Sequence, residues 1–389
     1  MSVLGIVAEY DPFHNGHLHH LQSSVAAVSP SAVFTVISGP FRQRGNPAFL
    51  SPFSRAECAL AAGADAVFAL PVLWTLRDAE HYALGAVSLL SSLGATHIAF
   101  GAETADITLL RKTAKLLENP PAAVRDALHS ALSEGIGFPA ALAEAAGAYA
   151  SECGELLRHP NNILAVCYLR AIQRLSLSLF PVVIPRSGDY FSDRIIPDAP
   201  SASAITESLR RGAWAQAFDA LPSFSRRVIR REYLSGTIPD SGRMDTLLLD
   251  KIRSLRKQDA ASLPDCTEGL DSALIKAAAE VNSRDELIGR LTTRRYSAAR
   301  ISRLCTSALL GITKKDTEET PLPKTVLLLA MKKDPSVTDP WKNGSVQVMT
   351  AAKWLNTAAP ADVNAWRIWS LLCGKPSAWP FEKKLITEP

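Results

Sequence analysis

The first twenty residues constrain the fold more than any other part of the chain. The apolar, β-branched run from Val3 to Val7 has the length of a buried strand, and Asp11-Pro12 follows its end. The segment His14-Asn-Gly-His17 comes next and leads into the helical pattern of Leu18 to Ala27. A strand, a tight turn with a glycine and a helix in this order are typical of the start of a nucleotide-binding α/β domain.

The two histidines of this turn predict a phosphate site. Backbone N–H groups at a helix N-terminus attract phosphate, and Gly16 has no side chain to block the approach of a ligand. From the same helix start, His14 and His17 can donate hydrogen bonds to the charge that develops on an α-phosphate when pyrophosphate leaves. The alternative is that both histidines only cap the turn or lie exposed on it. Their position directly after the first strand favours the phosphate site.

Strand and helix patterns continue to alternate after this turn. Apolar runs at residues 32–38, 65–70 and 96–101 predict three more strands, and residues 54–62 and 81–93 predict helices, the first capped by Ser54. This alternation implies a parallel sheet, so we expect an α/β fold that begins with a Rossmann-like domain. Ligands bind at the carboxyl ends of such strands, which makes Tyr10 to His17, Ser38 to Gly45 and Gly101 to Glu103 the segments of interest.

The rest of the chain changes character twice. Residues 104–180 read as mostly helical, residues 181–185 as a short strand, and Ser201 to Thr206 as the start of a helix. Polar helices follow, and a tryptophan-rich segment ends the chain. We therefore predict a catalytic domain over residues 1–206, a mainly helical basic region over residues 207–315, and a small C-terminal module over residues 316–389.

Positive charge gathers in the predicted helical region. The whole chain has a net charge of only +4, yet the segment from Glu207 to Lys257 holds eleven Lys or Arg against six acidic residues. A second basic cluster consists of Arg290, Arg294, Arg295, Arg300 and Arg303. Such faces are often merely solvated, but arginine pairs with phosphate in a bidentate manner and stacks on bases, which favours RNA as a partner.

Cysteine use and hydropathy indicate the compartment. The six cysteines are scattered without a C-x-x-C pair, so we expect reduced thiols in a cytoplasm and neither a disulfide framework nor a metal site. The most apolar long stretch, residues 56–76, contains Glu57, Asp65 and Pro71 and predicts no membrane span.

Two further segments support more than one interpretation. The loop from Ser38 to Gly45 is either a solvated basic loop or a substrate loop in which Arg44 meets phosphate or carboxylate. Ser201 and Ser203 lie where a helix begins, so they predict an N-cap and, in addition, a phosphate contact.

Several ordered motifs resemble the bacterial tRNA(Met) cytidine acetate ligases, which belong to the H-x-G-H nucleotidyltransferase superfamily. The resemblance covers roughly residues 1–315. It is carried by these segments: Glu9 to His17, Ser38 to Ala48, Gly85 to Ser88, Phe100 to Glu103, Pro160 to Leu164, Ser201 to Ile205 and Arg294 to Leu304.

This resemblance implies a two-step ligase reaction. ATP and acetate form acetyl-adenylate and pyrophosphate, and the acetyl group then passes to N4 of the wobble cytidine of elongator tRNA(Met). It implies ATP as substrate, Mg²⁺ bound with the ATP, and catalysis by His14 and His17. From the late basic cluster we expect tRNA binding by Arg294, Arg295, Arg300 and Arg303. The implied ATP-binding residues are Val7, Ala8, Glu9, Tyr10, Asp11, Pro12, Phe13, His14, Asn15, Gly16, His17, Leu18, His19, His20, Gly101, Asn161, Asn162 and Arg186.

The sequence departs from the family pattern in three places. Asp11 replaces a usual Asn, Pro40 replaces Asn or His, and Thr206 replaces an arginine expected to hold ATP phosphates. Two alternatives therefore stay open beside the ligase: another small-molecule nucleotidyltransferase of the same fold, and a catalytically weakened RNA-binding homologue.

Overall fold

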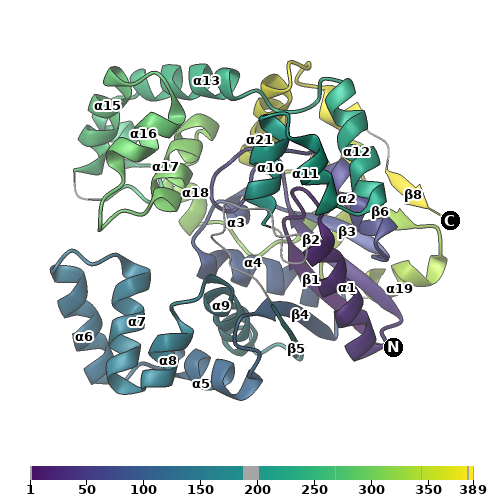
Figure 1. Cartoon of the computed structure of the whole chain (residues 1–389), viewed down its shortest axis with the longest axis horizontal. Coiled ribbons are helices and arrows are strands. Elements are labelled where there is room, and N and C mark those ends of the chain that lie inside the picture. Colours follow the sequence, from purple (N-terminus) through teal and green to yellow (C-terminus); the bar gives the residue numbers. More distant parts are fainter. Residues whose placement is uncertain (1, 187–200, 268, 343, 383–384, 389) are drawn as a thin grey trace.

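One mixed sheet organises the protein. The computed structural model describes residues 2–186, 201–267, 269–342, 344–382 and 385–388. The sheet has eight strands in the order β5–β4–β1–β2–β3–β6–β7, with β8 paired to β6 (Figure 1). The strands are β1 (Val3–Ala8), β2 (Ala32–Ser38), β3 (Ala66–Leu70), β4 (His97–Ala102), β5 (Phe180–Pro185), β6 (Thr325–Lys332), β7 (Gln347–Met349) and β8 (Ile386–Glu388).

The first five strands are parallel, so the predicted α/β fold is confirmed. Side chains of a strand alternate between the two faces of a sheet. In β2, Phe34 and Val36 enter the core on one face, while Val33 and Ile37 enter the core on the other. Because both faces of β2 are buried, its sequence is a continuous apolar run.

Helices cover both faces. In the first half of the chain they are α1 (Asn15–Val28), α2 (Pro52–Ala61), α3 (Val72–Thr75), α4 (Ala79–Ser92), α5 (Ile107–Glu118), α6 (Ala122–Ser133), α7 (Phe138–Tyr149), α8 (Ser151–Leu156) and α9 (Pro160–Arg174). Helices α4 and α9 pack on one face, and α1 and α2 pack on the other. The cap of α2 is Ser51, not the predicted Ser54, because Ser51 Oγ accepts the Ser54 N–H at 3.0 Å.

The second half of the chain is mainly helical, as predicted. Its helices are α10 (Ala202–Arg210), α11 (Trp214–Asp219), α12 (Ser223–Leu234), α13 (Ser241–Arg253), α14 (Lys257–Ala261), α15 (Leu270–Glu280), α16 (Arg284–Leu291), α17 (Ala298–Leu310), α18 (Lys314–Glu318), α19 (Asp339–Lys342), α20 (Ala351–Trp354) and α21 (Pro360–Leu372), with short 3₁₀ turns at Pro335–Thr338 and Trp379–Glu382. Helices α13, α15, α16, α17 and α21 share a core with α3 and with Phe41 of the loop after β2. Figure 1 shows α13, α15, α16 and α17 as one helical group beside the sheet, with α5 to α8 as a second group.

The C-terminal segment completes the sheet. We expected residues 316–389 to form a small module, but β6 pairs antiparallel with β3. Lys332 Nζ lies 2.6 Å from Asp65 Oδ1, which secures the end of this pairing. Trp369 of α21 is fully buried, and its indole N–H donates to the Ala48 carbonyl at 2.8 Å. The C-terminal segment thus packs against the N-terminal part of the chain.

The boundary predicted at residue 206 lies next to residues 187–200, which fall outside the described residues. The described residues after it do not separate cleanly from the first part of the chain. Helix α10 and helix α12 contribute Leu209 and Val228 to the same core as Leu4 and Ile6 of β1. Within the described ranges, no helix combines the length and the apolar character needed to cross a membrane.

The packing of α7 against α8 supplies a stability test. A Cβ added at Gly154 would lie 2.4 Å from the Gly147 Cα, a contact between two backbones that neither helix can relieve by a rotamer change. We expect Gly154→Ala to destabilise the protein by about 1–3 kcal/mol. Gly289 of α16 is the matched control, since a Cβ there meets nothing within 4 Å. Gly289→Ala should be neutral or stabilising by up to about 1 kcal/mol in denaturant unfolding. Equal stability of the two variants would contradict the close approach.

Candidate active site

The predicted turn leads into α1, and the two histidines cap the N-terminus of this helix. In the turn that joins β1 to α1, Tyr10 has a positive φ of 51° and the Asp11–Pro12 peptide bond is cis. His14 then caps α1. Its Nδ1 accepts the His17 backbone N–H at 3.4 Å, and the His17 Nδ1 accepts the His14 N–H at 3.3 Å. The two rings stack with their centroids 3.7 Å apart.

This reciprocal cap fixes the tautomer of both histidines. Because each Nδ1 accepts a hydrogen bond, each neutral ring carries its proton on Nε2 and keeps that N–H as a donor. Burial lowers the pKa of His14 to about 3, and the nearby Arg186 charge acts in the same direction. Burial also lowers the pKa of His17, with His14 and Arg186 adding to the effect. The pair therefore offers two neutral donors at neutral pH.

Residues from separate parts of the chain meet beside this pair. Gly101 lies in β4, Arg186 follows β5, and His20 lies in the second turn of α1. A Cβ at Gly101 would lie 3.8 Å from His20 Cδ2 and 3.9 Å from Arg186 Cβ. The structure thus brings these three predicted residues together at the carboxyl edge of the sheet, where sheets of this kind bind nucleotides.

Two buried polar atoms of this region have no hydrogen-bond partner among the described residues. They are the Tyr10 hydroxyl and His20 Nε2. Burial raises the pKa of Tyr10 above its ordinary value, so its hydroxyl stays a donor. Burial lowers the pKa of His20 to about 4. Buried polar groups are normally satisfied, so these atoms mark positions where a ligand could supply a partner.

The two asparagines at the start of α9 play different parts. Asn162 is fully buried, and its amide is hydrogen-bonded within the protein. Its Oδ1 accepts the Thr104 N–H, and its Nδ2 donates to the Thr104 hydroxyl and to the Leu156 carbonyl. Asn161 Oδ1 accepts a hydrogen bond from Arg186 Nη1 at 3.2 Å. Glu103 accepts from the backbone N–H groups of both asparagines, so it holds the start of α9. Of the two, Asn161 lies beside the cation of the site.

The hydroxyl-rich motif begins α10 as predicted. Ser201 Oγ accepts the Ala204 N–H at 3.0 Å and caps the helix, while Ser203 is exposed. Thr206, where the resemblance implies an arginine, is buried and donates to the Ala202 carbonyl at 2.8 Å. Its hydroxyl is used inside its own helix. Arg186 is the cation whose charge acts on His14, His17 and His20.

The remaining predicted residues of the first segment surround the turn. Asn15 Nδ2 donates to the Asp219 carbonyl at 3.2 Å, which ties the start of α1 to α11. Phe13 packs on Phe224 of α12 with ring centroids 5.6 Å apart. Val7 and Ala8 are the last residues of β1, and Glu9, Asp11 and Pro12 lie in the turn that follows it. Gly16 and Leu18 lie in the first helical turn of α1, and His19 is exposed on the same helix.

Asp11, where the resemblance implies an Asn, is buried and accepts two backbone hydrogen bonds. They come from Phe49 and Leu50 at 2.8 and 2.9 Å. Sequence reasoning missed Arg55 of α2, which is also fully buried. Its guanidinium donates to the carbonyls of Glu9, Ser38, Gly39 and Leu50. No local pattern could have indicated it, because a single arginine in a helix normally reads as solvated.

The loop after β2 docks on the helical region. Arg44 itself is exposed, and its carbonyl accepts from Ser302 Oγ at 2.5 Å. The late arginine cluster lies around the start of α17. Arg300 donates to the Asp265 carbonyl and Arg303 to the Asp265 carboxylate, at 2.9 Å each. Arg303 is buried, whereas Arg294 and Arg295 are exposed in the preceding turn.

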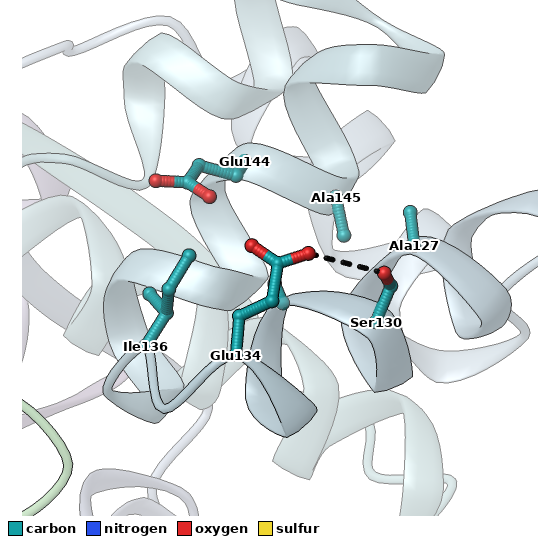
Figure 2. Close-up of a pocket in the computed structure, with 7 residues that line it drawn as sticks. Ala127, Ser130, Glu134, Ile136, Glu144 and Ala145 are labelled. Atoms are coloured by element: carbon teal, nitrogen blue, oxygen red, sulfur yellow. Dashed lines mark hydrogen bonds between the residues drawn. The ribbon is translucent and has the colours of Figure 1, made fainter.

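A surface pocket lies in the helical group of α5 to α8. It has a volume of about 280 Å³. Figure 2 shows it between α6 and α7, where Glu134 and Glu144 face it and Glu134 bonds to Ser130. It contains none of the predicted residues, and two carboxylates do not suit an anionic nucleotide. Among the residues that the structure describes, no three His, Cys, Asp or Glu side chains converge as a metal site.

Comparisons with known proteins agree with this geometry. Residues 1–375 match the family described as HIGH Nucleotidyl Transferase. The chain belongs to this family. Two relatives are named tRNA(Met) cytidine acetate ligase. The one from Fervidobacterium nodosum is 35% identical, over 82% of this chain and 75% of the relative. The one from Syntrophomonas wolfei is 36% identical, over 82% of this chain and 78% of the relative. The predicted family resemblance is therefore confirmed.

Solved structures share the whole fold. The crystal structure of Thermotoga maritima TmcAL bound with alpha-thio ATP has a TM-score of 0.91 at 28% sequence identity, over 100% of both chains. The apo form I of the same protein has a TM-score of 0.93 at 28% identity, over 100% of this chain and 99% of that one. The nucleotidyltransferase fold of this family therefore extends over the whole chain.

The depressed histidine pKa values can be measured directly. We expect the imidazole resonances of His14 and His20 not to titrate between pH 5 and 8, because their pKa values of about 3 and 4 leave both rings neutral there. NMR of protein with labelled histidine, assigned through His14→Gln and His20→Gln, tests this. The unfolded chain takes up these protons near pH 6.5, so both groups make the fold less stable as the pH falls below that value. A midpoint near 6.5 for either ring would contradict the buried, neutral state.

Proposed function

We propose that this protein is an ATP-dependent tRNA(Met) cytidine acetate ligase. In the first step an acetate oxygen attacks the α-phosphorus of ATP, and pyrophosphate leaves. In the second step N4 of the wobble cytidine attacks the acetyl carbonyl, AMP leaves, and N4 loses one proton. The observation that carries the proposal is the stacked His14–His17 pair, which holds two Nε2–H donors at the N-terminus of α1.

The relatives support the choice of substrates. Two relatives that are 35% and 36% identical to this chain are named tRNA(Met) cytidine acetate ligase. The Thermotoga maritima protein of the same fold binds alpha-thio ATP in its crystal structure, which supports a nucleotide site. These likenesses favour the ligase over a small-molecule nucleotidyltransferase and over a weakened RNA-binding homologue.

The geometry suits stabilisation of a transferring nucleotidyl group. Charge builds up on the α-phosphate oxygens in the transition state, and preorganised donors stabilise it without reorganisation. Two neutral imidazoles donate to that charge, the helix N-terminus adds its backbone dipoles, and Arg186 supplies a full positive charge.

Mg²⁺ and the cellular setting are further parts of the proposal. Mg²⁺ retains waters and binds largely to substrate phosphates in such sites, so it would arrive with ATP. We place the reaction in the cytoplasm, because all six cysteines are buried thiols without disulfides, as in a reducing compartment.

Recognition of tRNA belongs, in this proposal, to the helical region. Arg294 and Arg295 are exposed in one turn and can meet backbone phosphates. Arg300 and Arg303 bind Asp265 and so hold the neighbouring loop in place. Their contribution to tRNA binding is then indirect, through the shape of the surface that carries Arg294 and Arg295.

Loss of either histidine should impair the first step. We expect His14→Ala or His17→Ala to lower acetate-dependent ATP–pyrophosphate exchange by about 10²-fold or more, because each removes one donor to the developing charge. His129→Ala is the control, since His129 is exposed on α6. Nucleoside analysis of tRNA(Met) after reaction should show N4-acetylcytidine at the wobble position with the unmutated protein. Unchanged exchange in both histidine variants would refute the site.

The exposed arginines should affect tRNA alone. We expect Arg294→Ala with Arg295→Ala to weaken tRNA(Met) binding and to reduce the slope of log affinity against log salt by about 1 to 2, because two phosphate contacts are lost. Acetate-dependent exchange without tRNA should not change. Arg158→Ala on the loop after α8 is the control for an exposed arginine outside this cluster. An unchanged salt slope would assign tRNA binding to other residues.

A further inference from the structure

We propose that Arg42 binds the carboxylate of acetate and that Ser302 and Thr306 of α17 are positioning residues that hold its loop. This inference rests on the proposed function and deepens it. It assigns the two substrates to opposite sides of the turn after β1. Gly101 and Arg186 lie on the side of β4 and β5, whereas the loop with Arg42 follows β2, the neighbour of β1 on the other side.

Arg42 has the properties of an anion-binding residue. Its side chain is only 14% exposed and its Nε lies 3.5 Å from Asp11 Oδ2, yet this Nε makes no hydrogen bond among the described residues. Arg55 and Arg284 are near enough that the Arg42 charge lowers the pKa of each. Asp11 and Glu9 are the carboxylates that act on Arg55, and each already accepts backbone N–H groups. A small carboxylate would complete the pairing.

Helix α17 fixes the loop that carries Arg42. Thr306 Oγ1 donates to the Gly45 carbonyl at 2.5 Å, beside the bond from Ser302 to Arg44. Gly45 has a φ of 84°, and a Cβ there would lie 2.7 Å from the Ser302 carbonyl oxygen. Arg284, itself buried, donates to both the Ser302 hydroxyl and the Gly45 carbonyl. The loop is therefore held in one position against α17.

The same loop also contacts the turn after β1. The Gln43 backbone N–H donates to Glu9 Oε1 at 2.7 Å, and its side chain donates to the Arg77 carbonyl at 2.6 Å. A shift of the loop would move Arg42 relative to His14 but would leave Gly101 and Arg186 in place. Misplacement by even about 1 Å can cost a reaction about 10²-fold. Loosening the contact with α17 should therefore impair the use of acetate before it impairs the binding of ATP.

The helix offers a matched set of variants. Thr306→Val removes the hydroxyl at nearly constant volume, and Thr306→Ser restores it. Ser307→Ala is the control, since Ser307 is buried on the same helix and its hydroxyl has no partner among the described residues. Arg42→Met removes the proposed ligand and keeps a long side chain.

The experiment is acetate-dependent ATP–pyrophosphate exchange with the full-length protein and without tRNA. We expect Arg42→Met and Thr306→Val to raise the KM for acetate by about tenfold or more while the KM for ATP stays within about twofold. Thr306→Ser and Ser307→Ala should behave like the unmutated protein. Equal changes in both KM values, or an unchanged KM for acetate in Arg42→Met, would overturn the inference and leave the ligase activity standing. Absence of exchange in the unmutated protein would instead refute the proposed function.

Discussion

A guanidinium without access to solvent holds the carboxyl edge of the sheet together. Arg55 donates to backbone carbonyls at the ends of β1 and β2 and in the loop that precedes α2. Burial lowers its pKa, and the charges of Asp11 and Glu9 act against that effect. Removing one partner from such a buried network leaves several polar groups unsatisfied, which is costly. The turn with His14 and the loop with Arg42 therefore depend on the same side chain.

In the proposed reaction, this arrangement would let one turn serve two substrates. The histidines lie at the start of α1, with the sheet edge of β4 and β5 on one side and the loop after β2 on the other. That loop is held by α17, an element from a distant part of the sequence. Thr206, in contrast, makes its hydrogen bond only to a near neighbour in the sequence. Its buried hydroxyl is bonded within its own helix, and the cation beside the histidines is Arg186.

Local sequence patterns were sufficient for the first five strands and for the histidine turn. Buried parallel strands are continuous apolar runs, so the predicted residues 32–38 coincide with β2. The same reasoning could not place β6, because its antiparallel pairing with β3 joins distant parts of the sequence. It could not identify Arg55 or Thr306 either, since both act through backbone carbonyls that only the tertiary fold brings within reach. Asn161 and Asn162 looked equivalent in the sequence, and only their partners distinguish them.

The pairing of β6 with β3 has a consequence for synthesis of the chain. Until residue 332 has emerged from the ribosome, β3 is an edge strand that exposes unpaired backbone groups next to Phe68 and Val67. Such edges favour pairing with other chains. The turn after β1 is made first and the strand that shields its sheet is made late, so a nascent chain carries its aggregation-prone edge through most of translation.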